Sequence, residues 1–198
     1  IFYINTMMPF GAGLAGKFLG QKVIYHVHET SIRPNALKKI LLQIIKFTST
    51  RNIFVSSFLA NTENIKEIRS STIYNALPEI FTAKAIKHKY EYSNEFNVLM
   101  ICSLKEYKGI LEFIEICKLC QRNNEKIIFN LVLNAPQSEI NSYFNGIKLP
   151  LNITIYSSQT NLHSFYEKAT IVLNLSRVDE WIETFGMTIL EAMSYGIP

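Results

Sequence analysis

Glu183 and Glu191 lie eight residues apart near the end of the chain, with the pair Phe185-Gly186 between them. From Gly186 onward the residues favour a helix, and a glycine and a proline would end it. Glu183 is therefore expected on the loop that enters this helix, and Glu191 within the helix. Because the first amides of a helix lack intrahelical partners, they can bind an anion. Such a helix would offer a phosphate site at its start and two carboxylates that accept hydrogen bonds from hydroxyls, which suits a nucleotide sugar.

Two glutamates on a helix are common, so the spacing alone would equally fit a solvent-exposed helix. The complete string is more specific. Residues 183–198 read Glu-x-Phe-Gly-x-x-x-Leu-Glu-Ala-Met-x-x-Gly-x-Pro, which resembles the donor-site signature of the family-4 retaining glycosyltransferases at nine positions in sixteen. The resemblance implies that Glu183 contacts hydroxyls of the donor sugar and Glu191 those of the ribose. It also implies that amides near Phe185–Met187 bind the donor diphosphate.

The same resemblance implies an α/β chain of the GT-B type, in which two Rossmann-like parallel-sheet domains face each other across a cleft, both incomplete here. The implied reaction moves a sugar from a UDP- or GDP-sugar to a glycan or lipid-linked acceptor in polysaccharide biosynthesis, with retention of the anomeric configuration. No cofactor beyond the donor is implied. Asp179 is the only aspartate, so the Asp-x-Asp metal site of the other large glycosyltransferase class cannot form within these residues, and a metal-independent enzyme is expected.

A second stretch that could bind phosphate runs from Ser103 to Gly109 and follows the apolar segment 96–102. The resembled family usually has Gly-Arg-Leu…Lys-Gly here, and its arginine and lysine both hold the donor diphosphate. Lys108 matches the lysine, whereas Cys102 and Ser103 stand in place of Gly-Arg. Lys105 could supply a charge, but an ammonium does not reproduce a bidentate guanidinium. This departure leaves open a noncatalytic homologue that only binds nucleotide sugars.

The segment from Lys22 to His28 reads as an apolar strand that ends in polar groups. Ligands of open parallel sheets bind outside the carboxyl ends of the strands, which places His28 and Glu29 at a site. In the resembled family a histidine at this strand end faces the donor sugar, so His28 joins Glu183 as a predicted catalytic residue. His26 is expected to point to the opposite face of the sheet and to be structural.

A competing hypothesis rests on Gly11-x-Gly13-x-x-Gly16, which has the spacing of a dinucleotide-binding fingerprint. That fingerprint has its first glycine in the turn directly after a strand, whereas residues 7–10 intervene here. Glu29, in the place of a ribose-binding acid, follows Gly16 by only thirteen residues. Small residues in a helix that packs tightly on a sheet explain the pattern equally well. An NAD(P)-dependent oxidoreductase therefore stays as an alternative.

Strands and helices are expected to alternate in both halves of the chain, which favours two parallel-sheet domains. A polar, aperiodic stretch at 81–95 reads as the linker between a first domain at 1–80 and a donor-binding domain at 96–198. Arg177 and Glu180 are expected on the surface of a loop. The expected strands are 2–6, 22–28, 52–56, 72–78, 96–102, 127–133, 153–156 and 171–174, and the expected helices are 11–19, 34–48, 58–65, 138–144, 162–168 and those that start near 110 and 186.

The composition, with 48% apolar and 18% charged residues, indicates a globular chain. A net charge of +4 without a basic arm gives no indication of nucleic-acid binding, and no apolar segment is long enough to span a bilayer. Three cysteines without a disulfide framework favour the cytoplasm. The basic amphipathic helix at 34–48 leaves two interpretations, a cover for the sheet or peripheral contact with the inner face of a membrane. The chain is expected to be a piece of a longer protein, because it starts inside a strand.

Overall fold

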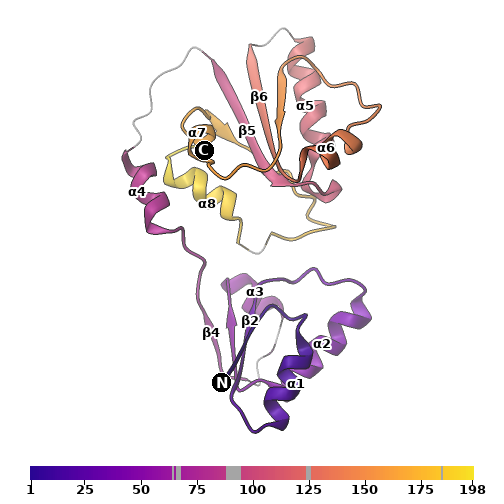
Figure 1. Cartoon of the computed structure of the whole chain (residues 1–198), viewed down its shortest axis with the longest axis vertical. Coiled ribbons are helices and arrows are strands. Elements are labelled where there is room, and N and C mark those ends of the chain that lie inside the picture. The colour runs from indigo at the N-terminus through magenta and orange to yellow at the C-terminus, as the bar shows by residue number, and fades with distance from the viewer. Residues whose placement is uncertain (64, 66–67, 88–94, 124–125, 184) are drawn as a thin grey trace. The chain divides into compact units, whose positions relative to one another are not determined.

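The computed structural model describes residues 1–198 except 64, 66–67, 88–94, 124–125 and 184. The described residues form two compact units. Unit 1 consists of Ile1–Ala76 with Ile182–Phe185, and unit 2 consists of Leu77–Trp181 with Gly186–Pro198. Each unit has its own four-stranded parallel sheet with helices between the strands (Figure 1). This alternation confirms the predicted fold class of two Rossmann-like units.

The sheet of unit 1 has the strand order β1-β2-β3-β4. The last strand differs from the prediction of a strand at 72–78. Phe54 ends β3 and pairs with Thr72, so the strand pairing stops there and residues 73–78 adopt no regular structure. The bounds are β1 Phe2–Asn5, α1 Phe10–Phe18, β2 Val23–Val27, α2 Asn35–Thr48, β3 Arg51–Phe54, α3 Ser57–Thr62 and β4 Ser70–Thr72.

One face of this sheet is buried under helices, and the glycines of α1 allow the close packing. The side chains of β2 alternate between buried and partly exposed positions, as expected for a strand with one covered face. A Cβ atom added at Gly13 would lie 2.0 Å from the Tyr25 hydroxyl oxygen, and one added at Gly16 would lie 2.7 Å from a methyl of Val23. These glycines therefore pack α1 against β2 inside the helix, and do not form the turn that a dinucleotide fingerprint requires.

The sheet of unit 2 has the strand order β7-β6-β5-β8, so the order reverses between β5 and β8. The predicted strands and helices of this half are present with small shifts at their ends. A short 3-10 helix, η1, lies between β5 and α5. The bounds are α4 Glu79–Lys87, β5 Phe96–Ser103, η1 Glu106–Lys108, α5 Ile110–Arg122, β6 Ile127–Asn134, α6 Gln137–Tyr143, β7 Ile153–Tyr156, α7 His163–Tyr166, β8 Ile171–Val172 and α8 Met187–Ser194.

Unit 2 has helices on both faces of its sheet, as Figure 1 shows for α5 and α6 on one side and α7 and α8 on the other. Residues of β5 and β6 pack with α5 and α6 in one hydrophobic cluster. Leu99 and Val132 point to the other face, where they pack with residues of α7 and α8. Val98, Leu99 and Met100 are consecutive and all buried, which is the pattern of a strand covered on both faces.

Helix α4 lies in the stretch that the sequence analysis interpreted as an aperiodic linker. Phe81 and Ala85 are spaced one turn apart and both pack against the cluster of α7 and α8, which explains why a short helix forms here. Ile80 and Ile86 of the same helix are exposed, so the apolar residues of this segment do not form one stripe that would predict a helix. Residues 88–94 of the predicted linker lie outside the described part of the chain.

Candidate functional site

The reversal of strand order in unit 2 defines where a ligand would bind. In open parallel sheets the connections on either side of such a reversal leave to opposite faces, and a crevice opens at the carboxyl ends of the two strands. Here the chain goes from β5 to α5 on one face and from β8 to α8 on the other. The segments at this point are 103–109, after β5, and 173–181, after β8.

Gly109, the last residue of the first segment, packs closely against the second segment. It has a left-handed backbone with φ of 78° and lies directly before α5. A Cβ atom added to it would lie 2.3 Å from the backbone oxygen of Leu175, in the segment after β8. Only glycine fits such a contact in such a conformation. The sequence pair Lys108-Gly109 therefore has a structural reason, which is to hold the start of α5 against the end of β8.

Lys108 lies at this junction, beside two aromatic rings. The Tyr107 and Trp181 rings stack with centroids 5.1 Å apart, and the Lys108 ammonium nitrogen is 5.8 Å and 5.7 Å from their centroids. A cation over aromatic faces is attracted by their negative charge density. The side chain of Lys108 is thereby directed along the segment that carries Trp181, whereas Lys105 is exposed.

Cys102 and Ser103, which stand where the resembled family usually has Gly-Arg, have uncharged side chains. Ser103 ends β5 and is partly buried. Burial raises the pKa of the neighbouring Cys102 thiol to about 12, so this thiol stays neutral at physiological pH. Neither residue can supply the positive charge of a guanidinium.

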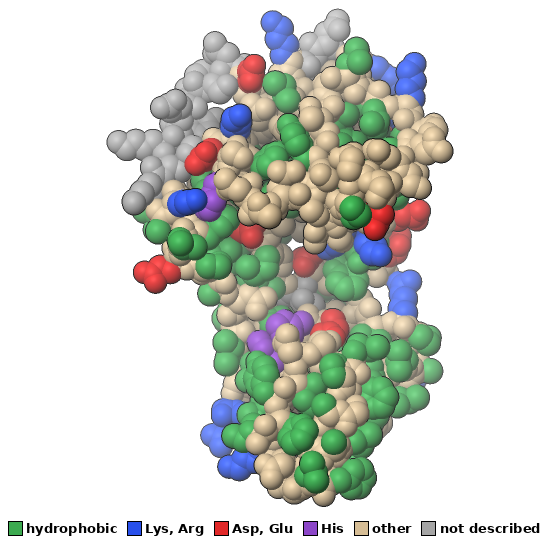
Figure 2. All heavy atoms as spheres, viewed as in Figure 1, with side chains coloured by type: hydrophobic (Ala, Val, Ile, Leu, Met, Phe, Trp, Pro, Cys, Tyr) green, Lys and Arg blue, Asp and Glu red, His purple; other side chains and the backbone are tan. Residues whose placement is uncertain are grey.

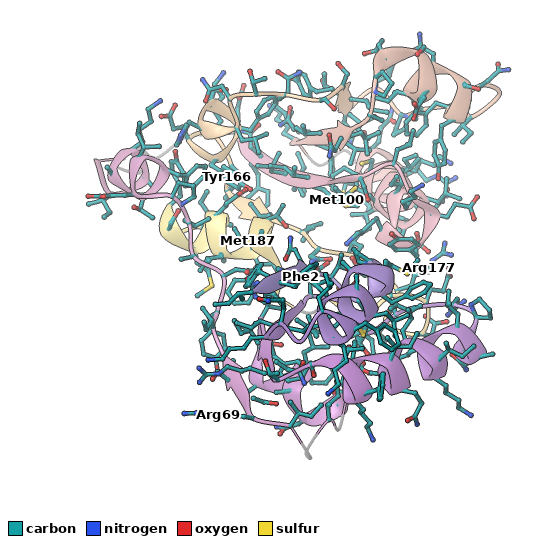
Figure 3. All side chains as sticks on the ribbon, turned by 60° about the horizontal axis from the view of Figure 1, so that its bottom comes forward. Phe2, Arg69, Met100, Tyr166, Arg177 and Met187 are labelled. Carbon is teal, nitrogen blue, oxygen red and sulfur yellow. The ribbon has the colours of Figure 1, made fainter. Side chains whose placement is uncertain are left out.

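Arg177 has a role that the sequence analysis missed. Its Nε atom donates to Glu112 of α5 at 2.7 Å and its Nη1 atom to Glu180 at 2.9 Å. Its backbone amide donates to the backbone carbonyl oxygen of Tyr107. The hydrogen bonds that Arg177 donates to Glu180 and Glu112 raise its pKa. Arg177 thus ties the segment after β8 to α5 (Figure 3), a contact between residues 65 apart in sequence that no local pattern reveals.

The helix predicted around the two glutamates is present as α8. Gly186 precedes it with φ of 68°, and its carbonyl accepts the amides of Ile189 and Leu190. Glu183 lies before the helix and is exposed, and Glu191 lies inside it and is partly buried. Glu183 belongs to unit 1 and Glu191 to unit 2. Thr184, between Glu183 and Phe185, lies outside the described residues.

Glu191 has a buried partner that the sequence did not indicate. The Tyr166 hydroxyl donates to Glu191 Oε2 at 2.5 Å. Burial, and then the neighbouring carboxylate, raise the pKa of Tyr166. Tyr166, labelled in Figure 3, comes from α7, and Glu191 comes from α8. Their separation of 25 positions carries no periodic signal.

His28 lies at the end of β2, as predicted, among polar side chains of unit 1. Its Nε2 atom is 2.6 Å from the Asn5 side-chain oxygen, and its ring lies 4.2 Å from that of His26. The prediction that His26 points to the opposite face was wrong, because residues two apart in a strand share a face. Burial and the neighbouring His28 lower the pKa of His26. Figure 2 shows histidine side chains gathered at one end of unit 1 beside an acidic side chain.

Glu29, at the same strand end, is hydrogen-bonded to backbone amides. Its carboxylate accepts hydrogen bonds from the amides of Met7 at 3.2 Å and His28 at 3.1 Å. It thereby fixes the loop after β1 to the end of β2, which accounts for an acid at this position without a bound ribose.

A metal site and a membrane-spanning helix each place requirements on the described residues. No three His, Cys, Asp or Glu side chains in the described part of the chain gather closely enough to hold a metal ion. Within the same residues, no helix has the length and apolar character to cross a membrane.

Residues 82–198 match the family described as Glycosyl transferases group 1. The chain belongs to this family. Three solved structures resemble almost the whole of it. HepE of Anabaena, solved with UDP and glucose, has a TM-score of 0.71 and 17% identity over 99% of this chain and 57% of that one. TarM has a TM-score of 0.75 and 14% identity over 99% of this chain and 39% of that one.

A glycosyltransferase of Rickettsia africae has a TM-score of 0.65 and 20% identity over 100% of this chain and 56% of that one. At these identities the likeness shows the fold, which is the predicted GT-B fold with two Rossmann-like units. This chain spans between about two fifths and three fifths of the length of the three solved chains. No curated protein sequence matches it.

Proposed function

We propose that this chain carries the donor site of a retaining glycosyltransferase, which moves a sugar from a UDP- or GDP-sugar to a glycan or lipid-linked acceptor. The observation that carries the proposal is the junction of β5 and β8 in unit 2. There Gly109 contacts Leu175 and Lys108 lies over the Tyr107 and Trp181 rings. HepE was solved with UDP and glucose, and the pneumococcal O-GlcNAc transferase GtfA with UDP and GlcNAc, which supports a nucleotide sugar as the donor.

In this proposal the diphosphate is bound by positive and dipolar groups of the chain. The Lys108 ammonium and the amides at Phe185–Met187, at the start of α8, face its negative charge. Ser103 adds a hydroxyl donor and Lys105 a second charge at the edge of the site. The absence of an Asp-x-Asp sequence favours a metal-independent reaction, in which these groups take the part of a divalent cation.

The proposed roles of the acidic residues are to position the donor. Glu191 accepts hydrogen bonds from the ribose hydroxyls, and Glu183 accepts them from the sugar. The bond between the anomeric carbon and the diphosphate breaks, and the acceptor oxygen bonds to that carbon on the same face. The acceptor proton passes to the leaving diphosphate oxygen, and His28 contacts the sugar at the end of β2. The protein stabilises the oxocarbenium-like state through orientation and fixed charge.

A noncatalytic nucleotide-sugar binder is the second candidate. It is favoured by the uncharged pair Cys102-Ser103 and by the engagement of Arg177 with Glu112 and Glu180, which keeps this guanidinium on α5. The oxidoreductase alternative loses its support, because Gly13 and Gly16 are required by the packing of α1.

Peripheral contact with the inner face of a membrane is part of the proposal for unit 1. Ile40 and Phe47 of α2 and Phe18 of α1 have more than half of their surface exposed, at 57%, 58% and 78%. The Lys17 ammonium lies 5.6 Å from the Phe47 ring centroid. Exposed apolar side chains beside basic ones are typical of helices that lie on anionic lipids. Sedimentation with vesicles tests this, and equal binding of wild type and Phe47→Ser to anionic vesicles would contradict it.

Thermal unfolding in the presence of nucleotides tests the donor site. A ligand that binds only the folded state stabilises it by about 2.7 kcal/mol at 100 times its Kd. The ligands are UDP-, GDP- and ADP-sugars beside NAD and NADP, and the variants are Glu191→Ala and Lys108→Ala. Lys118→Ala is the control, since Lys118 pairs with Glu115 on the surface of α5.

We expect one nucleotide sugar to raise the melting temperature of the wild type. This increase should be lost in both site variants and kept in the control. A rise with NAD or NADP alone would contradict the proposal. A protein that binds a nucleotide sugar, but neither transfers nor slowly hydrolyses it, would favour the noncatalytic binder.

A further inference from the structure

Tyr166 has the chemistry of a permanent hydrogen-bond donor to Glu191. It is fully buried, with 0% of its surface exposed, and its hydroxyl lies 2.5 Å from Glu191 Oε2. Burial and the carboxylate raise the pKa of Tyr166, so the hydroxyl keeps its proton at any physiological pH. A short hydrogen bond to an ionised acceptor belongs to the strong class of such bonds.

The ring of Tyr166 is held in place by two aromatic neighbours. Tyr195, just after α8, stacks on it with centroids 5.5 Å apart and an angle of 18°. Phe81 of α4 meets it edge-on with centroids 6.1 Å apart. Tyr195 is itself held by a hydrogen bond between its hydroxyl and His163 Nδ1, and Phe81 stacks on His163. The hydroxyl of Tyr166 is therefore a fixed point, and the Glu191 carboxylate must orient toward it.

We propose that Tyr166 is a positioning residue that orients the Glu191 carboxylate toward the ribose of the donor nucleotide. This inference rests on the proposed function. A carboxylate offers about four acceptor positions on its two oxygens, so the bond to Oε2 leaves acceptor positions for ribose hydroxyls. The terminal torsion of a glutamate side chain is otherwise broadly distributed. Because the bond to Tyr166 already fixes Oε2, less conformational entropy of the Glu191 side chain is lost when a ligand binds. Tyr166 thereby raises the preference of the site for a ribonucleotide over its 2′-deoxy form.

The experiment measures, by titration calorimetry on the full protein, the affinity for UDP, GDP and their 2′-deoxy forms. The variants are Tyr166→Phe, which removes the hydroxyl and keeps the ring, and Glu191→Ala. Tyr156→Phe is the matched control, because Tyr156 is a tyrosine of the same unit whose hydroxyl donates to Asn130 and not to a carboxylate. The quantity compared is the ratio of the two affinities within each variant. A loss of folded protein lowers both affinities equally and cancels from that ratio.

Wild type and Tyr156→Phe are expected to prefer the ribonucleotide, and Glu191→Ala is expected to lose the preference. Tyr166→Phe is expected to reduce the preference by about three- to tenfold, the scale of one ordinary net hydrogen bond. A full preference in Tyr166→Phe, with or without a lower melting temperature, would overturn the inference and leave the proposed function intact. Wild type that binds no nucleoside diphosphate, or a preference that survives Glu191→Ala, would overturn the proposed function and this inference with it.

Discussion

Replacing Gly109 with alanine tests the contact that joins the two segments of the proposed donor site. An L-residue at φ of 78° costs about 1–2 kcal/mol. The added Cβ would also lie 2.3 Å from the Leu175 oxygen and 2.6 Å from the Leu175 Cβ. Because one of these atoms belongs to the backbone, the segment after β8 must move, and such overpacking costs about 1–3 kcal/mol. Together, Gly109→Ala is expected to lower the free energy of unfolding by about 2–5 kcal/mol.

Gly146 supplies a matched control. It has nearly the same backbone, with φ of 80°, but a Cβ added there meets no atom within 4 Å. Gly146→Ala therefore has only the backbone cost, and the entropy that either alanine removes from the unfolded chain is common to both variants. We expect Gly109→Ala to be less stable than Gly146→Ala by about 1–3 kcal/mol.

Urea unfolding followed by circular dichroism measures both variants, with the slope m as a check that the same surface is exposed. Gly109→Ala should also bind the donor more weakly than Gly146→Ala, since Lys108 is the preceding residue. Equal stability of the two variants would refute the close approach of Gly109 to Leu175, and with it the reason given for the Lys108-Gly109 pair.

Three further predictions follow from single residues. Lys108→Ala should weaken nucleotide-sugar binding about ten- to hundredfold, the scale of one charge-assisted hydrogen bond, while Lys118→Ala binds as wild type does; equal binding by Lys108→Ala in calorimetry would contradict this. Gly13→Ala should be destabilising by about 1–3 kcal/mol through the clash with Tyr25, whereas Gly11→Ala, which meets nothing within 4 Å, should be neutral or stabilising; similar urea midpoints for the two would be the contrary result. The pKa of Cys102 is raised from 9.0 to about 12, so the unfolded chain loses this proton first and the free energy of unfolding should fall as pH rises from about 9 towards 12. Cys102→Ala should reduce this fall, measured as urea midpoints against pH. An unchanged dependence of the midpoint on pH would argue against a thiol whose pKa is raised by burial.

The strands, most helices and the position of α8 could be predicted because their signals are local. Apolar segments such as 96–102 and the Gly-Pro end of the last helix depend only on neighbouring residues. The two-glutamate string placed Glu183 before α8 and Glu191 inside it for the same reason. Predictions failed or were absent where the cause is tertiary. β4 stops where β3 has no more residues to pair with, and α4 forms because Phe81 and Ala85 find a cluster to pack against.

The network around the site could not be derived from the sequence. Arg177 and Glu112 are 65 residues apart, and Tyr166 and Glu191 are 25 apart. Such pairs form because the strand order β7-β6-β5-β8 brings distant segments together, and a single sequence carries no periodicity that would link them. His26 is different, since its shared face with His28 follows from the period of a strand and could have been predicted correctly.

Hydrogen–deuterium exchange of the full protein with and without nucleotides tests the location of the donor site most directly. The nucleotides are UDP- and GDP-sugars, with NAD and NADP for comparison. The account predicts that one nucleotide sugar slows exchange at 103–110 and at 185–191, and that Lys108→Ala removes this protection. Protection confined to 11–16 by NAD or NADP would contradict the account, as would the absence of protection at 103–110 with every nucleotide sugar.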